Sequence, residues 1–546
     1  MRTQTLFLLL AAVLFTSGCL SETQPEEQEG VSTFDSEQEF IQYMEQSSVA
    51  GETGSTSDYG GAVVEESTEE LDAERDLAED DGQGTVESAE WIQTSNDTIF
   101  VSHRYPRHFH SVELPELGLE HNLSEVGGPS VASDGSLIME ESDRIVSYDS
   151  EMNEDWEQEL DTRVEEMKLS GDQLILLTRE NSVECPVRPM HEVEVSCSSI
   201  VRPGYTGQSD FTYTLTTLDT VTGDEVESMS FVASSRTEVE VTPEETFISY
   251  TERTPDHEIM TDFLLNEASI TGDTRERVEE LQGYDLTPRS MEIEIEAVIS
   301  ENEDMEELEE EFNQYDRENL REYEESTLMI VDNEDLSIEE RTFDGAISSI
   351  DSGIETVLEI EYNGVEWDNS EKEIRILDGA SRELDGDARI FNEQILIEES
   401  EELKLLNFEL EEVSSESIEA LTVETFDDKI LVSVRHDEVS QLVLFDSELN
   451  RLDSKRFESR ALWGFELVGE ETGYTLVSGM ENNTLLEITD QIKVFETDAS
   501  GTLVYESRLY SVSDKVQKIS NTGEIEDELE LEVPRMMRPI PEPIPR

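Results

Sequence analysis

The strongest constraint on the fold is a repeated phrase of two short apolar runs, each followed by a polar turn. The clearest copy spans residues 421–457, where residues 430–432 and 442–445 are β-prone and Asp446 opens the second turn. Related phrases recur near Val112, Asp149, Asp219, Asp332, Asp378, Asn407 and Glu496. Most spacings are about 45 residues, which suits one four-stranded sheet per phrase.

The repeat predicts an all-β fold, a β-propeller, over residues 86–533. Weaker phrases near Asn407 and Ser520 could each be a blade or half of one. We therefore expect about seven blades, with six to eight allowed.

A different pattern interrupts the repeat over about residues 264–325. Apolar residues keep three- and four-residue spacing within Glu-rich sequence, at Met305, Leu308, Phe312, Tyr315, Leu320 and Tyr323. This spacing is typical of an amphipathic helix. We expect a helical insertion between blades, packed on the rim.

Residues 1–18 have the pattern of a signal peptide. Arg2 precedes an apolar run, residues 6–15, that is too short to span a bilayer. The following Ser17-Gly18-Cys19 resembles the lipobox of exported lipoproteins, which implies cleavage before Cys19 and a lipid on its thiol. The alternative is an ordinary signal peptide cut nearby. We expect export and anchoring to the outer face of the cell membrane.

The two ends of the mature chain differ from its middle in composition. Residues 19–85 are rich in Glu, Ser, Gly and Thr and predict an acidic tether. One short helix interrupts it near residues 34–46, where Ser36 and Glu39 can form a capping box. Residues 534–546 form a Pro-rich tail that we expect to be an extended, passive end.

The charge of the chain restricts its environment and its partners. The sequence has 134 acidic and 36 basic residues, a net charge of −98, yet 36% of its residues are hydrophobic. Such a chain can form a core, but its carboxylates repel one another unless salt screens them. The composition predicts a halophilic source. Nucleic acid is excluded as a partner because no basic stripe exists to neutralise phosphates.

The cysteines suggest one disulfide. With Cys19 carrying a lipid, Cys185 and Cys197 remain, and an even remainder outside the cell favours a bond between them. A zinc site with His191 is the alternative, but it lacks a fourth ligand.

Other candidate sites are weaker. His103, His108 and His110 could hold a transition metal if a hairpin brought them together, although an exposed loop explains them more simply. Glycosylation acceptor sequences begin at Asn96, Asn122 and Asn482. The sequence contains no GxSxG, HExxH or Walker motif, so we name no catalytic residue and no cofactor.

Five segments together resemble a family of secreted prokaryotic proteins, common in archaea, that carry a C-terminal β-propeller domain. The segments are FDSEQEFIQYMEQ, SAEWIQTSNDTIFVSHRY, the loop between Cys185 and Cys197, STLMIVDNEDLSIEERTF and TFDDKILVSVRHDEVSQLVLFDSELNRLDS. Residues 91–96 depart from the acidic, Lys-containing signature that is usual in the family's first strand. The resemblance implies a propeller and export, and it carries no catalytic or ligand-binding residue.

Two functions are compatible with these features. The first is a monomeric cell-surface lipoprotein, held to the membrane through Cys19, whose propeller binds a protein, glycan or small ligand. The second is an extracellular enzyme, either a glycoside hydrolase or lyase or a cofactor-dependent dehydrogenase, with its site at the channel mouth. Converging carboxylates or histidines with shifted pKa values at the channel would favour the enzyme.

The halophilic assignment gives a first test. We expect the protein to unfold more easily when salt falls from above about 1 M to about 0.1 M, because the Debye length grows from ~3 Å to ~10 Å and the carboxylates then repel one another. Thermal melts followed by circular dichroism measure this change. An equal melting temperature at both salt concentrations would contradict the assignment.

Overall fold

The structure is a computed structural model that describes residues 31–44, 86–88 and, with short gaps, 92–531. The predicted signal peptide, Cys19, much of the tether and the Pro-rich tail lie outside the described residues, as do Asn96 and Asn482. None of the helices in the described part has the length and apolar character needed to cross a membrane.

Nine sheets of four or more strands follow one another along the described chain, and we number them 1 to 9. Eight have four strands, and sheet 3 has seven, of which four form the same meander as the others. Sheet 1 contains β3 (Ile92–Ser95), β4 (Thr98–His103), β5 (His108–Glu113) and β6 (Gly118–Ser124). Sheet 2 contains β7 (Ser130–Ser133), β8 (Ser136–Glu141), β9 (Arg144–Asp149) and β10 (Glu154–Glu159). The meander of sheet 3 contains β11 (Arg163–Ser170), β12 (Gln173–Glu180), β16 (Phe211–Asp219) and β17 (Glu225–Ala233).

The remaining six sheets have the same order of strands. Sheet 4 contains β18 (Glu238–Val241), β19 (Glu245–Arg253), β20 (Glu324–Asp332) and β21 (Ile338–Asp344). Sheet 5 contains β22 (Ala346–Ser352), β23 (Thr356–Asn363), β24 (Ser370–Ile376) and β25 (Ser381–Leu384). Sheet 6 contains β26 (Gly386–Phe391), β27 (Gln394–Glu399), β28 (Glu402–Leu406) and β29 (Glu412–Ser417). Sheet 7 contains β30 (Ala420–Phe426), β31 (Lys429–His436), β32 (Val439–Asp446) and β33 (Arg451–Phe457). Sheet 8 contains β34 (Leu462–Leu467), β35 (Tyr474–Gly479), β36 (Thr484–Ile488) and β37 (Ile492–Glu496). Sheet 9 contains β38 (Gly501–Tyr505), β39 (Arg508–Val512), β40 (Lys515–Ile519) and β41 (Ile525–Glu530).

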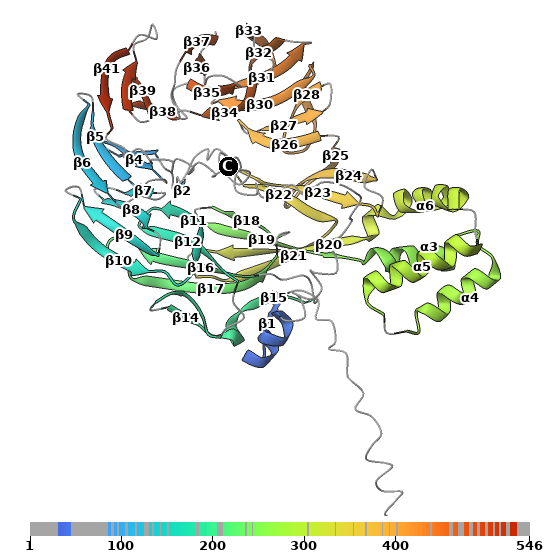
Figure 1. The fold of residues 1–546 in the computed structure, drawn as a ribbon. Coiled ribbons are helices and arrows are strands. Elements are labelled where there is room, and N and C mark those ends of the chain that lie inside the picture. Colours follow the sequence, from blue (N-terminus) through green and yellow to red (C-terminus); the bar gives the residue numbers. More distant parts are fainter. Residues whose placement is uncertain are drawn as a thin grey trace, which may run out of the picture.

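The sheets are arranged in a ring, with the first strand of each sheet toward the middle (Figure 1). Apolar side chains join neighbouring sheets: Val357 of sheet 5 and Ile395 of sheet 6, for example, belong to one buried cluster. Another cluster brings Ile99 of sheet 1 together with Val516 of sheet 9, so the first and last sheets also pack. This radial arrangement is that of a β-propeller, as predicted.

The described chain contains nine such four-stranded units, compared with the about seven blades that the repeat predicts. The weak phrases near Asn407 and Ser520 each belong to a separate four-stranded sheet, sheet 6 and sheet 9, rather than to half of one. Hydrophobic runs mark strands, but they do not say which strands pair, so the sequence leaves open whether a phrase with a polar outer strand such as β29 is a whole sheet.

The turn predicted after the second apolar run of the repeat is present, and it follows the third strand of the sheet. In the clearest copy, an Asp446 carboxylate oxygen accepts hydrogen bonds from the amides of Glu448 (3.0 Å) and Asn450 (2.8 Å). Leu449 has a left-handed backbone, with φ of 61°, and its side chain is buried. Burial of the leucine offsets the backbone cost. The same left-handed backbone recurs at Leu410, which is also buried, and at Met152 and Leu336, which are half-buried.

Four helices protrude from sheet 4: α3 (Asp256–Asn266), α4 (Gly272–Leu281), α5 (Pro288–Asn302) and α6 (Met305–Asn319), followed by η2 (Leu320–Glu322). They connect β19 to β20, so the insertion lies within a sheet and not between blades as predicted. Helical spacing identifies helices but cannot show that the flanking strands pair. Here the β19–β20 ladder ends at Arg253 and Glu324, whose side chains form an ion pair of 2.9 Å at the base of the insertion.

Residues 31–44, which lie within the predicted tether, contact sheet 3. β1 (Val31–Thr33) pairs with β15 (Val201–Pro203), which lies beside β17 at the outer edge of the sheet, and residues 37–44 are helical. β2 (Val86–Ser88) pairs with β11 at the inner edge.

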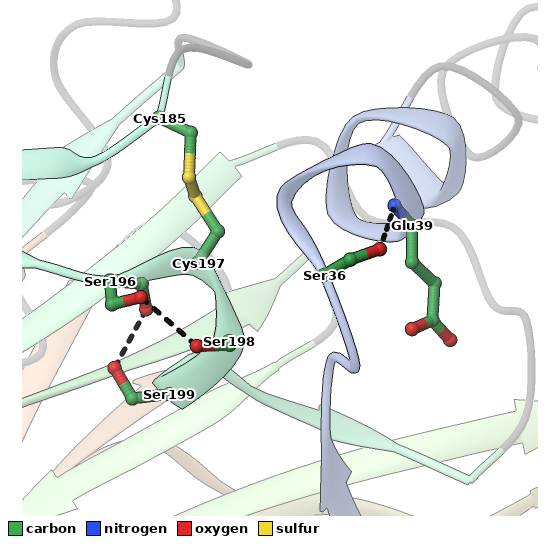
Figure 2. The surroundings of a disulfide bond; sticks show 7 residues. All are labelled: Ser36, Glu39, Cys185, Ser196, Cys197, Ser198 and Ser199. Carbon is green, nitrogen blue, oxygen red and sulfur yellow. Dashed lines mark hydrogen bonds between the residues drawn. A yellow bond between two sulfur atoms is a disulfide. The ribbon is translucent and has the colours of Figure 1, made fainter.

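A loop between β12 and β16 covers the helical residues 37–44 (Figure 2). It contains β13 (Val187–Met190), β14 (Val193–Val195) and η1 (Cys197–Ser199). Cys185 and Cys197 are paired in a disulfide, as predicted, with their Cα atoms 6.0 Å apart. Both sulfurs are thereby used, which argues against the zinc alternative with His191.

The turn at Asp446 provides a test of the repeated phrase. Asp446→Ala removes an acceptor of three hydrogen bonds, two from amides and one from the Asn450 side chain. We expect a loss of about 1–2 kcal/mol in the free energy of unfolding. Denaturant titration in high salt measures it. Glu416→Ala, at an exposed position on β29, is the control and should change stability by less than about 0.5 kcal/mol.

Candidate functional site

The first and second strands of sheets 5 and 6 and the first strand of sheet 7 carry a group of charged side chains that we call the Arg389 cluster. It consists of Arg389 on β26 and four carboxyl groups: Asp351, Glu359, Glu398 and Glu424. β22, β26 and β30 lie toward the middle of the ring (Figure 1), where a propeller presents its central channel.

Two of these carboxylates protect a sheet edge. β26 is the first strand of sheet 6, so alternate amides along it have no partner within the sheet. The amide of Ala388 donates to Glu359 Oε1 (2.6 Å) and that of Ile390 donates to Asp351 Oδ2 (2.8 Å). The two acids therefore satisfy an exposed edge and connect sheet 5 to sheet 6.

Arg389 connects sheet 6 to sheet 7. Its Nη1 donates to the carbonyl of Val423 on β30 (2.9 Å). Sheets 3 and 4 have an equivalent connection, in which Lys168 Nζ on β11 donates to the carbonyl of Val241 on β18 (3.1 Å). In both places a cation on one first strand binds the backbone of the next first strand.

Burial raises the pKa values of all four carboxyl groups in the cluster above their usual range. The positive charge of Arg389 opposes this rise for three of them, and backbone amides oppose it at Asp351, Glu359 and Glu424. The rise is largest at Glu424, whose pKa reaches about 7. A carboxyl group with this pKa can release or take up a proton near neutral pH.

The histidine window is only partly described. β4 and β5 place His103 opposite His108 in the last pair before their turn, and His110 lies opposite Val101. The His110 side chain is buried, whereas those of His103 and His108 lie outside the described residues. Within the described part of the chain, no three His, Cys, Asp or Glu residues are grouped as metal ligands would be. The metal site stays a hypothesis.

The remaining predicted sites are untested by the geometry. The backbone of Asn122 lies in β6, the outer strand of sheet 1, and its side chain is outside the described residues. Sequence reasoning missed the Arg389 cluster. The available signal was a charged residue in the middle of an apolar first strand, as in GDARIF (386–391) and LTVETF (421–426).

Comparison with known proteins gives little beyond the fold. No protein-family model matches the chain. An uncharacterized protein of Archaeoglobus fulgidus is 26% identical over 331 residues, which are 52% of this chain and 53% of that protein. The chain thus spans about half the length of this relative.

The similar solved structures include β-propeller domains. The Swd1 β-propeller domain of Myceliophteria thermophila is 10% identical, with 38% of this chain and 80% of that chain covered and a TM-score of 0.24. A eukaryotic initiation factor is 10% identical, with coverage of 76% and 97% and a TM-score of 0.34. The acylaminoacyl peptidase of Pyrococcus horikoshii is 11% identical, with coverage of 74% and 57% and a TM-score of 0.32. Likenesses of this size say nothing about activity.

Glu424 gives a prediction with a defined sign. Because its folded pKa is raised from 4.5 to about 7, its stabilising contribution is complete below pH 4.5 and is lost as pH rises through 7. Glu424→Gln should therefore gain stability relative to the native protein between these pH values, by up to about 3 kcal/mol. Denaturant titrations from pH 4 to pH 8 measure the difference. The control Glu419→Gln, at an exposed position, should show no such pH dependence.

Proposed function

We propose that this protein is an exported, lipid-anchored β-propeller of nine blades that acts as a binding module at the surface of a halophilic cell. The mature chain would begin at Cys19, whose thiol would carry the lipid. The propeller would present its loops and channel to a protein, glycan or small ligand that is not a polyanion, because a chain with a net charge of −98 repels phosphate and sulfate polymers.

The observation that carries the anchoring part is the position of the N-terminal segment. Only residues 20–30 separate Cys19 from β1, which is paired into the outer edge of sheet 3. An extended chain of that length spans at most about 40 Å. A lipid on Cys19 would thus hold the rim at sheet 3 close to the membrane and leave the opposite side of the ring for binding.

The alternative, an extracellular enzyme, has one observation in its favour: a carboxyl group with a pKa of about 7 on a channel strand. The neighbouring acids have another explanation, since Asp351 and Glu359 accept hydrogen bonds from the edge of β26. Those bonds are needed by the fold whether or not a reaction takes place. These acids therefore do not by themselves indicate a reaction, and we keep binding as the proposed function.

Replacement of Cys19 tests the anchor. In a halophilic host, the native protein should be found in the membrane fraction, with the mass of a lipid on its first residue. Cys19→Ser should move most of the protein to the soluble or secreted fraction, because the covalent site for the lipid is lost. Immunoblots of fractions and intact-mass spectrometry measure both effects. Ser21→Ala is the matched control, and an unmodified native N-terminus would refute the proposal.

A further inference from the structure

We propose that residues 31–44 form a docking segment that binds the propeller without needing the covalent connection that follows it. If residues 45–85 were cut, the segment would remain bound and the propeller would not be released. The consequence at a membrane rests on the proposed lipid anchor, whereas the binding itself does not.

Backbone pairing supplies the first part of the interaction. Val31, Ser32 and Thr33 pair in antiparallel register with Pro203, Arg202 and Val201 of β15. The amide of Val31 also donates to Glu340 Oε2 of sheet 4 (2.8 Å), so the segment contacts two neighbouring sheets. Strand addition of this kind is a general mode of peptide recognition.

An apolar face supplies the second part. Phe34 and Phe40 are 1% and 0% exposed, and Tyr43 and Met44 are also buried. Their partners come from the rest of the chain: they share a cluster with residues of sheets 2 and 3 and of the disulfide loop, namely Val131, Ile138, Met167, Leu176, Val187, Met190, Val195 and Cys197. The propeller and its disulfide loop therefore contribute to burying this face.

Arg202 supplies the third part. Its guanidinium carbon lies 4.7 Å from the ring centre of Phe34 and 5.6 Å from that of Tyr43, and its Nη2 pairs with Glu39 Oε1 (2.7 Å). The other oxygen of Glu39 accepts from the Asp35 amide (2.7 Å), which also orders the start of the helix. One cation thus holds both the aromatic face and the acidic side chain of the segment.

The N-terminus of the helix in this segment is capped by the segment's own side chains. Ser36 Oγ accepts a hydrogen bond from the amide of Glu39 (3.2 Å), as in the predicted capping box (Figure 2). Apolar burial and ring stacking depend little on ionic strength, so the docked state suits concentrated salt.

The test uses the full chain with a site for a sequence-specific protease inserted after Gly61. After complete cleavage in high salt, gel filtration should show residues up to the cut co-eluting with the propeller. Separation of the two fragments of the otherwise native protein would overturn the proposal. This readout does not require a lipid, so it stands even when Cys19 proves unmodified.

Variants then locate the interaction. Phe34→Ala combined with Phe40→Ala should weaken retention of the cleaved segment by at least about 100-fold, because two buried rings are lost. Arg202→Ala leaves the apolar cluster complete and should weaken it by about tenfold. Glu37→Ala, at an exposed position of the same helix, is the control and should match the native protein. Equal retention in all variants would contradict the assigned contacts.

In membranes, the same cleavage separates the two proposals. The cut protein should stay in the membrane fraction, and the cut Phe34→Ala, Phe40→Ala variant should leave it. Release of the cut native protein would overturn docking while leaving the lipid anchor intact. Absence of the uncut protein from membranes would overturn the anchor alone, since co-elution is measured separately.

Discussion

The structure depends on one packing requirement: a sheet with apolar residues on both faces, such as sheet 6, must be covered on both. Val357 and Ile395 meet across the junction of sheets 5 and 6, and Phe391 and Val423 meet across that of sheets 6 and 7. Since no sheet can end the stack, the last must cover the first, as Val516 does with Ile99. A ring gives each sheet a covering neighbour on both sides.

The scarce cations support this packing in a way that tolerates salt. Several donate across a junction to a backbone carbonyl of the next sheet, rather than only to a carboxylate: Lys168 to Val241, Arg253 to Asn363, Arg341 to Leu377, Arg382 to Leu410 and Arg389 to Val423. A hydrogen bond to a neutral carbonyl loses little when mobile ions screen charge. Carboxylates do the converse at the edge of β26, where Asp351 accepts from the amide of Ile390.

The N-terminal segment uses the same rules on a smaller scale. It adds a strand at the outer edge of sheet 3, buries Phe34 and Phe40, and binds Arg202 through stacking and an ion pair. β2 adds a strand at the inner edge of that sheet. Sheet 3 is therefore held at both edges by the chain that precedes the ring, and this makes it the natural position for the proposed anchor.

The sequence alone determined what depends on local pattern: the strand runs, the turn at Asp446, the capping box at Ser36 and the presence of helices near Met305 are all local and were predicted. The pairing of Cys185 with Cys197 followed from parity. The tertiary structure alone decided the number of sheets, the position of the helices between β19 and β20, the docking of residues 31–44 and the Arg389 cluster. These features depend on contacts between residues that are distant in the chain. Local sequence does not show which distant residues come together, and those residues set the burial and the strand pairing.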